Sequence, residues 1–246
     1  MVVSASVGTR RPYPALVQAL PPLPTAVAFR NASDGLLGTT RDIEVTRDGG
    51  RTWKVVFRTP RPVSWIGYDA SGRPRAILDD GENLGGPRWQ PELQLEHLTP
   101  CPGGVNRAVQ SDDWVLCIGQ GSAGSGEKVV YRLTRSGPQR LAWAFLGPTP
   151  TMHGITSQGY AVGIAMAHDG FGIIWQARGP LLVTRDGGAT WLGLPTIGVP
   201  EVDWGISGAA LRRGIAWVLL ARGNVHRRLL ETTDHGHTWH VVRRWD

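Results

Sequence analysis

Short apolar runs recur along the whole of this 246-residue chain, separated by clusters of glycine, proline, aspartate and threonine. Ile43–Val45 and Leu181–Val183 are typical of these runs. No longer stretch repeats its apolar positions with the 3.6-residue period of an amphipathic helix. Brief apolar runs bounded by turn residues are typical of β-strands joined by tight turns. The pattern therefore predicts an all-β fold.

One turn sequence stands between such runs three times. It reads TRDGGRTW at residues 46–53, TRDGGATW at 184–191 and, less closely, TTDHGHTW at 232–239. Each copy is preceded and followed by an apolar run, which predicts a strand, a tight turn and a second strand. A hairpin that recurs in this way indicates a repeat architecture.

The residue types in this turn favour a structural role over a catalytic one. An aspartate can accept hydrogen bonds from nearby backbone N–H groups, and glycine supplies the positive φ that a tight turn needs. The tryptophan can then pack its large ring back over the turn. We expect these structural residues to be Thr46, Asp48, Gly50, Thr52, Trp53, Thr184, Asp186, Gly188, Thr190, Trp191, Thr232, Asp234, Gly236, Thr238 and Trp239.

The spacing of the copies predicts the number of repeats. The second and third copies lie 48 residues apart, and the first lies about three such intervals before the second, which leaves room for two degenerate copies. The segments Leu133–Gly137 and Leu78–Gly81 are the candidates for these copies. Proline-bearing linkers recur in phase with the turns, so we predict one domain over residues 1–246 made of five four-stranded units. Their expected ranges are 25–60, 61–100, 101–150, 151–200 and 201–246.

Residues 13–20 do not fit this count. They read as an additional outer strand ahead of the first unit, and such a strand could help to close a ring. This segment leaves counts of six or seven units open.

The repeated turn resembles the Asp-box, or BNR repeat, of sialidases, of sortilin-type receptor domains and of photosystem II assembly factors of the Ycf48 type. The fuller pattern, with an apolar strand before the turn, is most similar to the Ycf48-like group. The resemblance implies a β-propeller in which the box joins the two outer strands of a blade. It also implies that the box lies on the face away from the ligand.

Charge and composition narrow the set of partners. The chain carries 26 basic and 20 acidic residues, a formal net charge of +6, and all basic residues except Lys54 and Lys128 are arginines. A moderately basic surface favours acidic partners. The arginines are too dispersed for a nucleic-acid footprint, and no nucleic-acid motif is present. No apolar stretch is long enough to span a membrane.

The two cysteines, Cys101 and Cys117, leave two states open. A disulfide between them would favour export, and a pair of free thiols is the alternative. Met1–Arg11 lacks the apolar stretch of a signal peptide. Because families with Asp-boxes are mostly exported, we expect an exported protein whose leader is absent from this chain, with a cytoplasmic location as the alternative.

In a propeller, the linkers between blades and the loops between second and third strands share one face. Several arginines fall in these segments and could bind carboxylates through paired hydrogen bonds. Ordinary solvated loop arginines are the competing interpretation. The candidate binding residues are Arg58, Arg61, Arg88, Arg178, Arg222, Arg227 and Arg228.

These observations favour a non-catalytic binding or assembly scaffold that holds an acidic protein or an anionic glycan. The alternative is a sialidase-like hydrolase or a lectin. The arginine motif near the start of sialidases is broken at Phe29-Arg30-Asn31-Ala32, and no tyrosine lies in an obvious context with glutamate. We predict no catalytic residue, no cofactor and no metal site. His235, His237 and His240 are interpreted as solvated turn residues.

Overall fold

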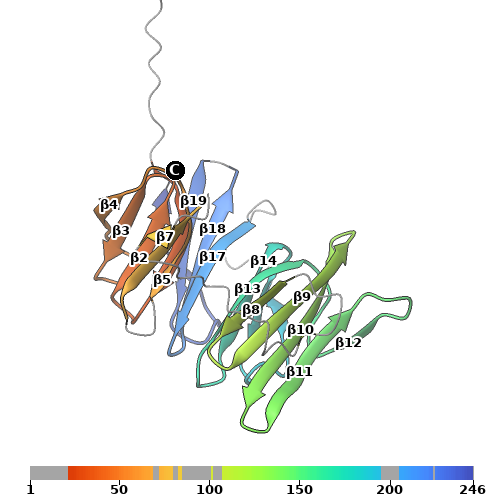
Figure 1. The fold of residues 1–246 in the computed structure, drawn as a ribbon. Coiled ribbons are helices and arrows are strands. Elements are labelled where there is room, and N and C mark those ends of the chain that lie inside the picture. The colour runs from red at the N-terminus through yellow and green to blue at the C-terminus, as the bar shows by residue number, and fades with distance from the viewer. Residues whose placement is uncertain are drawn as a thin grey trace, which may run out of the picture.

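The computed structural model describes residues 22–68, 72–79, 83–84, 101, 107–194, 205–223 and 225–245. All regular secondary structure within these ranges is β-strand, arranged in five sheets whose paired strands are antiparallel (Figure 1). We call the sheets blades 1 to 5 in chain order. Their strands follow one another in sequence order across each blade, because each strand pairs with the next through a short connection. No helix long and apolar enough to cross a membrane is found in this part of the chain.

The blades have the following strands. Blade 1 holds β1 (Pro24–Phe29), β2 (Gly35–Thr39), β3 (Asp42–Thr46) and β4 (Lys54–Arg58), and blade 2 holds β5 (Val63–Tyr68), β6 (Pro74–Leu78) and β7 (Asn83–Leu84). Blade 3 holds β8 (Arg107–Ser111), β9 (Trp114–Ser122), β10 (Ser125–Thr134), β11 (Gly137–Phe145) and β12 (Thr151–His153). Blade 4 holds β13 (Tyr160–Met166), β14 (Gly172–Arg178), β15 (Leu181–Thr184) and β16 (Leu192–Leu194). Blade 5 holds β17 (Gly205–Arg212), β18 (Ile215–Arg222), β19 (His226–Thr232) and β20 (His240–Trp245).

The first strands of the blades lie against one another, as they do in a β-propeller. β1 contacts both β5 and β17, while β13 contacts both β17 and β8. Blade 5 therefore lies beside blade 1, so segments near the two ends of the chain become neighbours (Figure 1). The predicted all-β propeller of antiparallel blades is confirmed. Blades 1, 4 and 5 have the expected four strands, whereas blade 3 has five and the described part of blade 2 has three.

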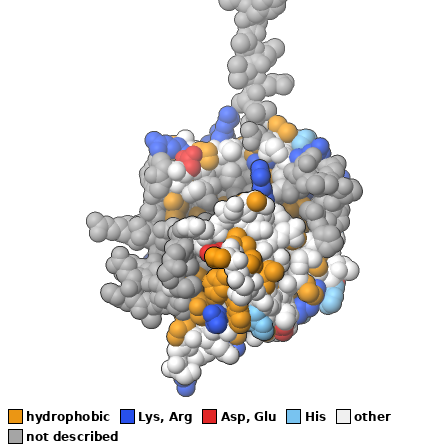
Figure 2. Space-filling model, turned by 90° about the vertical axis from the view of Figure 1, so that its right-hand side faces the viewer, with side chains coloured by type: hydrophobic (Ala, Val, Ile, Leu, Met, Phe, Trp, Pro, Cys, Tyr) orange, Lys and Arg blue, Asp and Glu red, His pale blue; other side chains and the backbone are white. Residues whose placement is uncertain are grey.

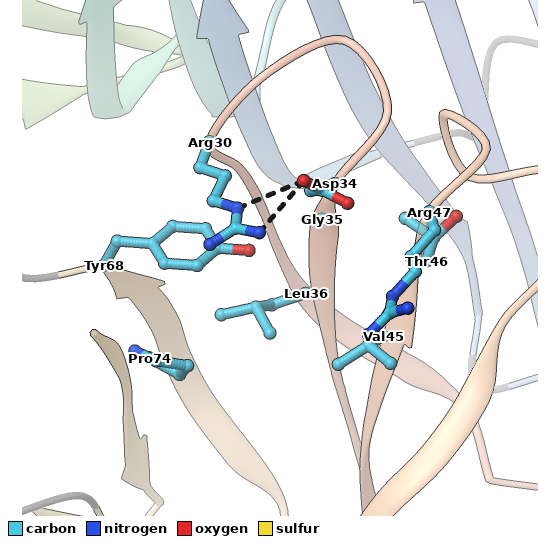
Figure 3. Close-up of a pocket in the computed structure, with 9 residues that line it drawn as sticks. All are labelled: Arg30, Asp34, Gly35, Leu36, Val45, Thr46, Arg47, Tyr68 and Pro74. Carbon is cyan, nitrogen blue, oxygen red and sulfur yellow. Dashed lines mark hydrogen bonds and ion pairs between the residues drawn. The ribbon is translucent and has the colours of Figure 1, made fainter. Parts of the chain in front are cut away.

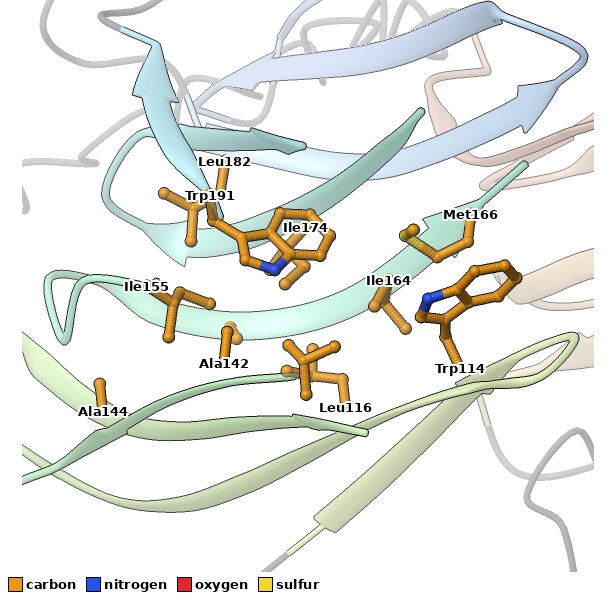
Figure 4. Close-up of a cluster of buried hydrophobic side chains, with 12 residues drawn as sticks. Trp114, Leu116, Ala142, Ala144, Ile155, Ile164, Met166, Ile174, Leu182 and Trp191 are labelled. Atoms are coloured by element: carbon orange, nitrogen blue, oxygen red, sulfur yellow. The ribbon is translucent and has the colours of Figure 1, made fainter. Parts of the chain in front are cut away.

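Hydrophobic side chains fill the spaces between neighbouring blades. Between blades 3 and 4, Trp114 and Leu116 of β9 pack with Ile164 and Met166 of β13 and with Trp191 (Figure 4). Blades 1, 4 and 5 are each packed on both faces, which explains why central strands such as β14 and β18 are nearly continuous apolar runs rather than alternating ones. Burying each large side chain of this kind contributes roughly 1.5–3 kcal/mol.

Blade 3 and blade 4 meet at a different place from the predicted boundary at residue 150. Thr151 and Met152 pair with Phe145 and Ala144, so residues 151–153 form an extra outer strand of blade 3. The first strand of blade 4 begins only at Tyr160. The prolines at 148 and 150 were expected to mark a crossing between blades, but the chain turns back on its own sheet before it crosses.

The two expected degenerate turns have different outcomes. Arg135 and Ser136 form the turn between β10 and β11, the third and fourth strands of blade 3, which is where the complete copies also lie. Leu78 instead ends β6, the second strand of blade 2, so this segment starts after the second strand and not after the third. Asp80 and Gly81 lie outside the described residues. The predicted strand at 13–20 lies outside the described residues.

Candidate functional site

The turn at residues 46–53 is closed by side-chain hydrogen bonds. The Thr46 hydroxyl donates to Asp48 Oδ1 (2.8 Å) and accepts the N–H of Gly50 (3.0 Å). Asp48 accepts from both the N–H (2.9 Å) and the hydroxyl (2.6 Å) of Thr52. The indole N–H of Trp53 donates to the carbonyl of Gly50 (2.9 Å). Each residue that is identical in all three copies of the turn therefore has a hydrogen-bond partner inside the turn.

The same five bonds recur in the turns at 184–191 and 232–239. The hydroxyl and then the N–H of Thr52 lower the pKa of Asp48 to about 2. The equivalent donors from Thr238 hold the pKa of Asp234 well below its usual range. In the third copy His235 takes the left-handed backbone conformation, with φ of 57°, at the position where the other copies have glycine.

These turns also connect neighbouring blades. The indole N–H of Trp114, in blade 3, donates to the Gly187 carbonyl in the turn of blade 4 (2.8 Å). The Arg185 side chain in that turn donates to the carbonyl of His235 in the turn of blade 5 (2.9 Å). His235 in turn contacts Asp169 of the β13–β14 loop (3.1 Å). Arg243 of blade 5 donates to the Arg51 carbonyl in the turn of blade 1 (3.4 Å), so all three turns bond to a neighbouring blade in addition to closing their own hairpins.

Four of the candidate arginines lie at the opposite end of the blades from these turns. Arg58 ends β4, Arg178 ends β14 and Arg222 ends β18, while Arg61 follows in the linker after β4. The Thr59 N–H donates to the Arg41 carbonyl (2.7 Å), which places that linker beside the β2–β3 loop. Blades 1, 4 and 5 therefore each present arginine at this end, which we call the linker face.

The linker face is basic without being one continuous patch. Arg58, Arg61 and Arg178 are exposed, whereas Arg222 is half-buried. On the side of the molecule shown in Figure 2, Lys and Arg side chains lie scattered among hydrophobic and uncharged ones. Because these arginines lie on three different blades, they suit separate contacts with several acidic groups rather than one concentrated site.

The remaining three candidate arginines are not exposed residues of the linker face in the described part of the chain. The guanidinium of Arg227 donates to the carbonyls of Pro24 (3.0 Å), Gly223 (3.0 Å) and His226 (2.8 Å), and burial lowers its pKa. Its bond to Pro24 ties blade 5 to blade 1, so it holds two neighbouring blades together. Arg228 is half-buried within β19, and Arg88 lies outside the described residues.

Lys128 is a buried cation that the sequence reasoning missed. Its ammonium lies within hydrogen-bond distance of the carbonyls of residues 126, 156, 157, 158 and 159, at 2.8–3.4 Å. Burial lowers its pKa to about 8. It pins the segment that leads from blade 3 into blade 4. The sequence feature that could have indicated it is a lysine within an apolar strand, in a chain whose basic residues are nearly all arginines.

Cys101 and Cys117 form a disulfide, with their Cα atoms 5.6 Å apart. Cys117 is fully buried in β9, and Cys101 precedes the first strand of blade 3. Of the two states that the sequence left open, the structure contains the disulfide. It fastens the chain entering blade 3 to the second strand of that blade.

One close pair of carboxylates bears on the hydrolase alternative. Burial raises the pKa of Glu44, and the charge of Asp42 raises it further, while Arg243 opposes the change. Glycosidases need two carboxyl groups that both reach the substrate. Asp42 is only 6% exposed and lies on β3, in the outer half of blade 1, so this pair does not offer that arrangement.

The three histidines of the third turn region do not converge. His235 contacts Asp169 and His240 contacts Glu231, each at 3.1 Å, and His237 is exposed. Within the described ranges, no group of three or more His, Cys, Asp or Glu side chains is arranged to hold a metal ion.

No protein-family profile matches the chain, and no curated protein sequence matches it. Solved structures that are similar to this chain include Ycf48 bound to D1 peptide. It is 15% identical, with a TM-score of 0.38, and the match covers 91% of this chain and 82% of that one. Ycf48 from Cyanidioschyzon merolae is 14% identical with a TM-score of 0.35, over 91% and 85%. A gluconolactonase from Xanthomonas campestris is 13% identical with a TM-score of 0.39, over 81% and 83%. These likenesses assign neither an activity nor a partner to this chain.

Proposed function

We propose that this protein is an exported, non-catalytic binding or assembly scaffold of the Asp-box propeller type. It recognises an acidic protein segment or another anionic ligand through the linker face. The observation that carries the proposal is the placement of Arg58, Arg61, Arg178 and Arg222 at one end of three blades. The Cys101–Cys117 disulfide supports export, because disulfides persist in oxidising compartments.

The two ends of the blades have different uses in this proposal. At one end, the threonine and aspartate side chains of the three turns form hydrogen bonds within the turn, and other groups of the turns bond to the neighbouring blade. At the linker face, exposed guanidinium groups present planar sets of donors that match carboxylates. Ycf48 in complex with D1 peptide gives a precedent for partner binding by a propeller of this general kind. The present chain would use the arginines of its linker face to bind its partner.

Binding of a fluorescein-labelled polyglutamate peptide, followed by fluorescence anisotropy at low salt, tests the proposal. The double variant Arg58→Glu/Arg61→Glu should weaken binding at least about tenfold, because it replaces two attractive contacts with repulsive ones. Binding by the unaltered protein should also weaken as salt is added. Sialyllactose, tested alongside, distinguishes an anionic glycan from a protein segment as the preferred ligand.

Arg135→Glu is the control matched in charge to the single linker-face variant Arg58→Glu, which should also weaken binding. Arg135 is exposed in the turn between β10 and β11, at the end of blade 3 opposite the linker face. This variant changes the net charge in the same direction and should leave peptide binding nearly unchanged. Equal weakening by the control and by the linker-face variant would show that net charge alone is responsible, and would refute the assigned surface.

A further inference from the structure

A pocket of about 150 Å³ opens between blades 1 and 2, at the end of the molecule that bears the repeated turns (Figure 3). Leu36, Val45 and Pro74 form its apolar walls, while Arg30 and Tyr68 lie at its edge. The pocket lies at one end of the hydrophobic cluster between these blades, which includes Leu36, Val45 and Tyr68. It is thus separate from the linker face and has a different composition.

The guanidinium of Arg30 is held in a fixed orientation. Its Nε and Nη2 atoms donate to the same oxygen of Asp34, Oδ2, at 3.3 and 3.0 Å. Asn31 also donates to that oxygen (3.0 Å), and Asn31 and then Arg30 lower the pKa of Asp34. Asp34 is therefore ionised at neutral pH. A guanidinium has five N–H groups, so Nη1 of Arg30 keeps its donors for a ligand.

The charges around the pocket favour an anion. Arg30 and Arg47 line it together with the single carboxylate of Asp34, which leaves one positive charge in excess. Arg47 is exposed and makes no hydrogen bond or ion pair with the part of the chain that the structure describes. Burial raises the pKa of Tyr68, with Arg30 opposing that rise, so its phenol stays protonated and can donate a hydrogen bond.

We propose that this pocket binds a small organic monocarboxylate with a compact apolar body. The carboxylate would lie at Nη1 of Arg30 and the Tyr68 hydroxyl, whose side chains lie together in Figure 3, while Arg47 adds its positive charge from the other side of the pocket. The body would lie against the apolar walls, since a cavity of about 150 Å³ accommodates a group the size of one aromatic ring. Specific small-molecule sites typically combine apolar walls with a few charged or polar groups that orient the ligand.

The test uses 4-fluorobenzoate as the probe and ¹⁹F NMR as the measurement, with the full-length protein. We expect saturable binding with a dissociation constant of about 1 mM, as befits a ligand of this size. Arg47→Gln should weaken binding severalfold, because it removes one of the two positive charges that line the pocket. 4-Fluorobenzamide, which has the same shape without the charge, should bind about tenfold more weakly than the benzoate.

Two further variants keep the result interpretable. Arg61→Gln removes an exposed arginine from the linker face and should leave benzoate binding unchanged. Asp34→Asn removes the one carboxylate that lines the pocket and raises its positive excess from one charge to two, so it should strengthen binding. The thermal unfolding midpoint shows whether the β1–β2 loop of this variant remains folded. Absence of saturable binding, equal affinity for the amide, or an Arg47→Gln variant that binds as tightly as the parent would each overturn the proposal.

The pocket and the proposed scaffold function stand independently of each other. The pocket variants lie at the end of the blades that bears the repeated turns, and the scaffold variants lie at the linker face. Failure of benzoate binding would leave polyglutamate binding unaffected, and the reverse also holds.

Discussion

At the residue scale, the most consequential atom of the repeated turn is the hydroxyl of its first threonine. In the second copy, the Thr184 hydroxyl accepts the N–H of Gly188 (3.0 Å) and donates to Asp186 (2.8 Å), and the residue is only 2% exposed. Burial raises the pKa of Asp186, but the hydrogen bonds from Thr190 and Thr184 outweigh it and the net change is downward. The threonine thus organises both the backbone and the carboxylate of the turn.

Replacing Thr184 with valine keeps the shape and removes the hydroxyl. We expect Thr184→Val to lower the free energy of unfolding by about 1–3 kcal/mol, because the buried N–H of Gly188 is left without an acceptor. Urea denaturation followed by tryptophan fluorescence measures this loss. Thr184→Ser retains the hydroxyl and should recover most of the stability. A valine variant as stable as the serine variant would mean that the hydrogen bonds of the hydroxyl add nothing to the stability of the fold.

At the scale of the single element, blade 3 departs most from a regular unit. Its extra strand β12 extends the sheet beyond β11, and the disulfide fixes the chain that enters it. Trp143 of β11 stacks on His153 of β12, with ring centroids 4.5 Å apart. The Arg140 guanidinium lies over the Trp143 ring, 4.2 Å from its centroid. These contacts help to hold the three-residue strand that forms this edge of the sheet.

The disulfide can be tested by removing both sulfur atoms. Cys101→Ser/Cys117→Ala should lower the free energy of unfolding by about 3 kcal/mol, the value expected for a cross-link that spans 16 residues. Differential scanning calorimetry of the variant and of the parent with reductant should show similar losses. The variant itself should not respond to reductant. A parent protein whose unfolding is unchanged by full reduction would contradict this expectation.

At the scale of the whole molecule, the contact between blades 1 and 5 brings the first and last blades together. The rings of Phe29 and Trp217 stack with their centroids 3.9 Å apart and their planes 9° from parallel. The Arg227 guanidinium bonds the Pro24 carbonyl, 203 residues away in the chain. Closing such a long loop costs entropy, and contacts at the closure must offset that cost.

A double-mutant cycle on Phe29 and Trp217 measures the strength of this closure. Trp217→Ala alone should destabilise the fold by about 3–5 kcal/mol, since the side chain is fully buried. The combined variant with Phe29→Ala should lose less than the two single losses added, with a coupling of about 1 kcal/mol from the stacked rings. Additive losses would show that the two blades do not depend on this contact.

Local chemistry accounts for what could be predicted from the sequence. The turns at 46–53, 184–191 and 232–239 are each closed by bonds within eight residues, so their hairpins could be read directly from the residue types. The same holds for the strands, whose apolar runs and bounding turn residues are local features. Placement of Arg58 and Arg178 at the end opposite the turns follows from the up-and-down order of strands within a blade.

Contacts between distant segments required the tertiary structure. The assignment of residues 151–153 to blade 3, the use of Arg227 as a link between blades, and the carbonyl cage around Lys128 are not visible in any local pattern. The pocket that joins Arg30 to Tyr68 likewise forms only where blades 1 and 2 meet. The sequence by itself determined the hairpins, because their hydrogen bonds close within a few residues. Tertiary structure decided which side chains stay available for binding, because that depends on which blade packs against which.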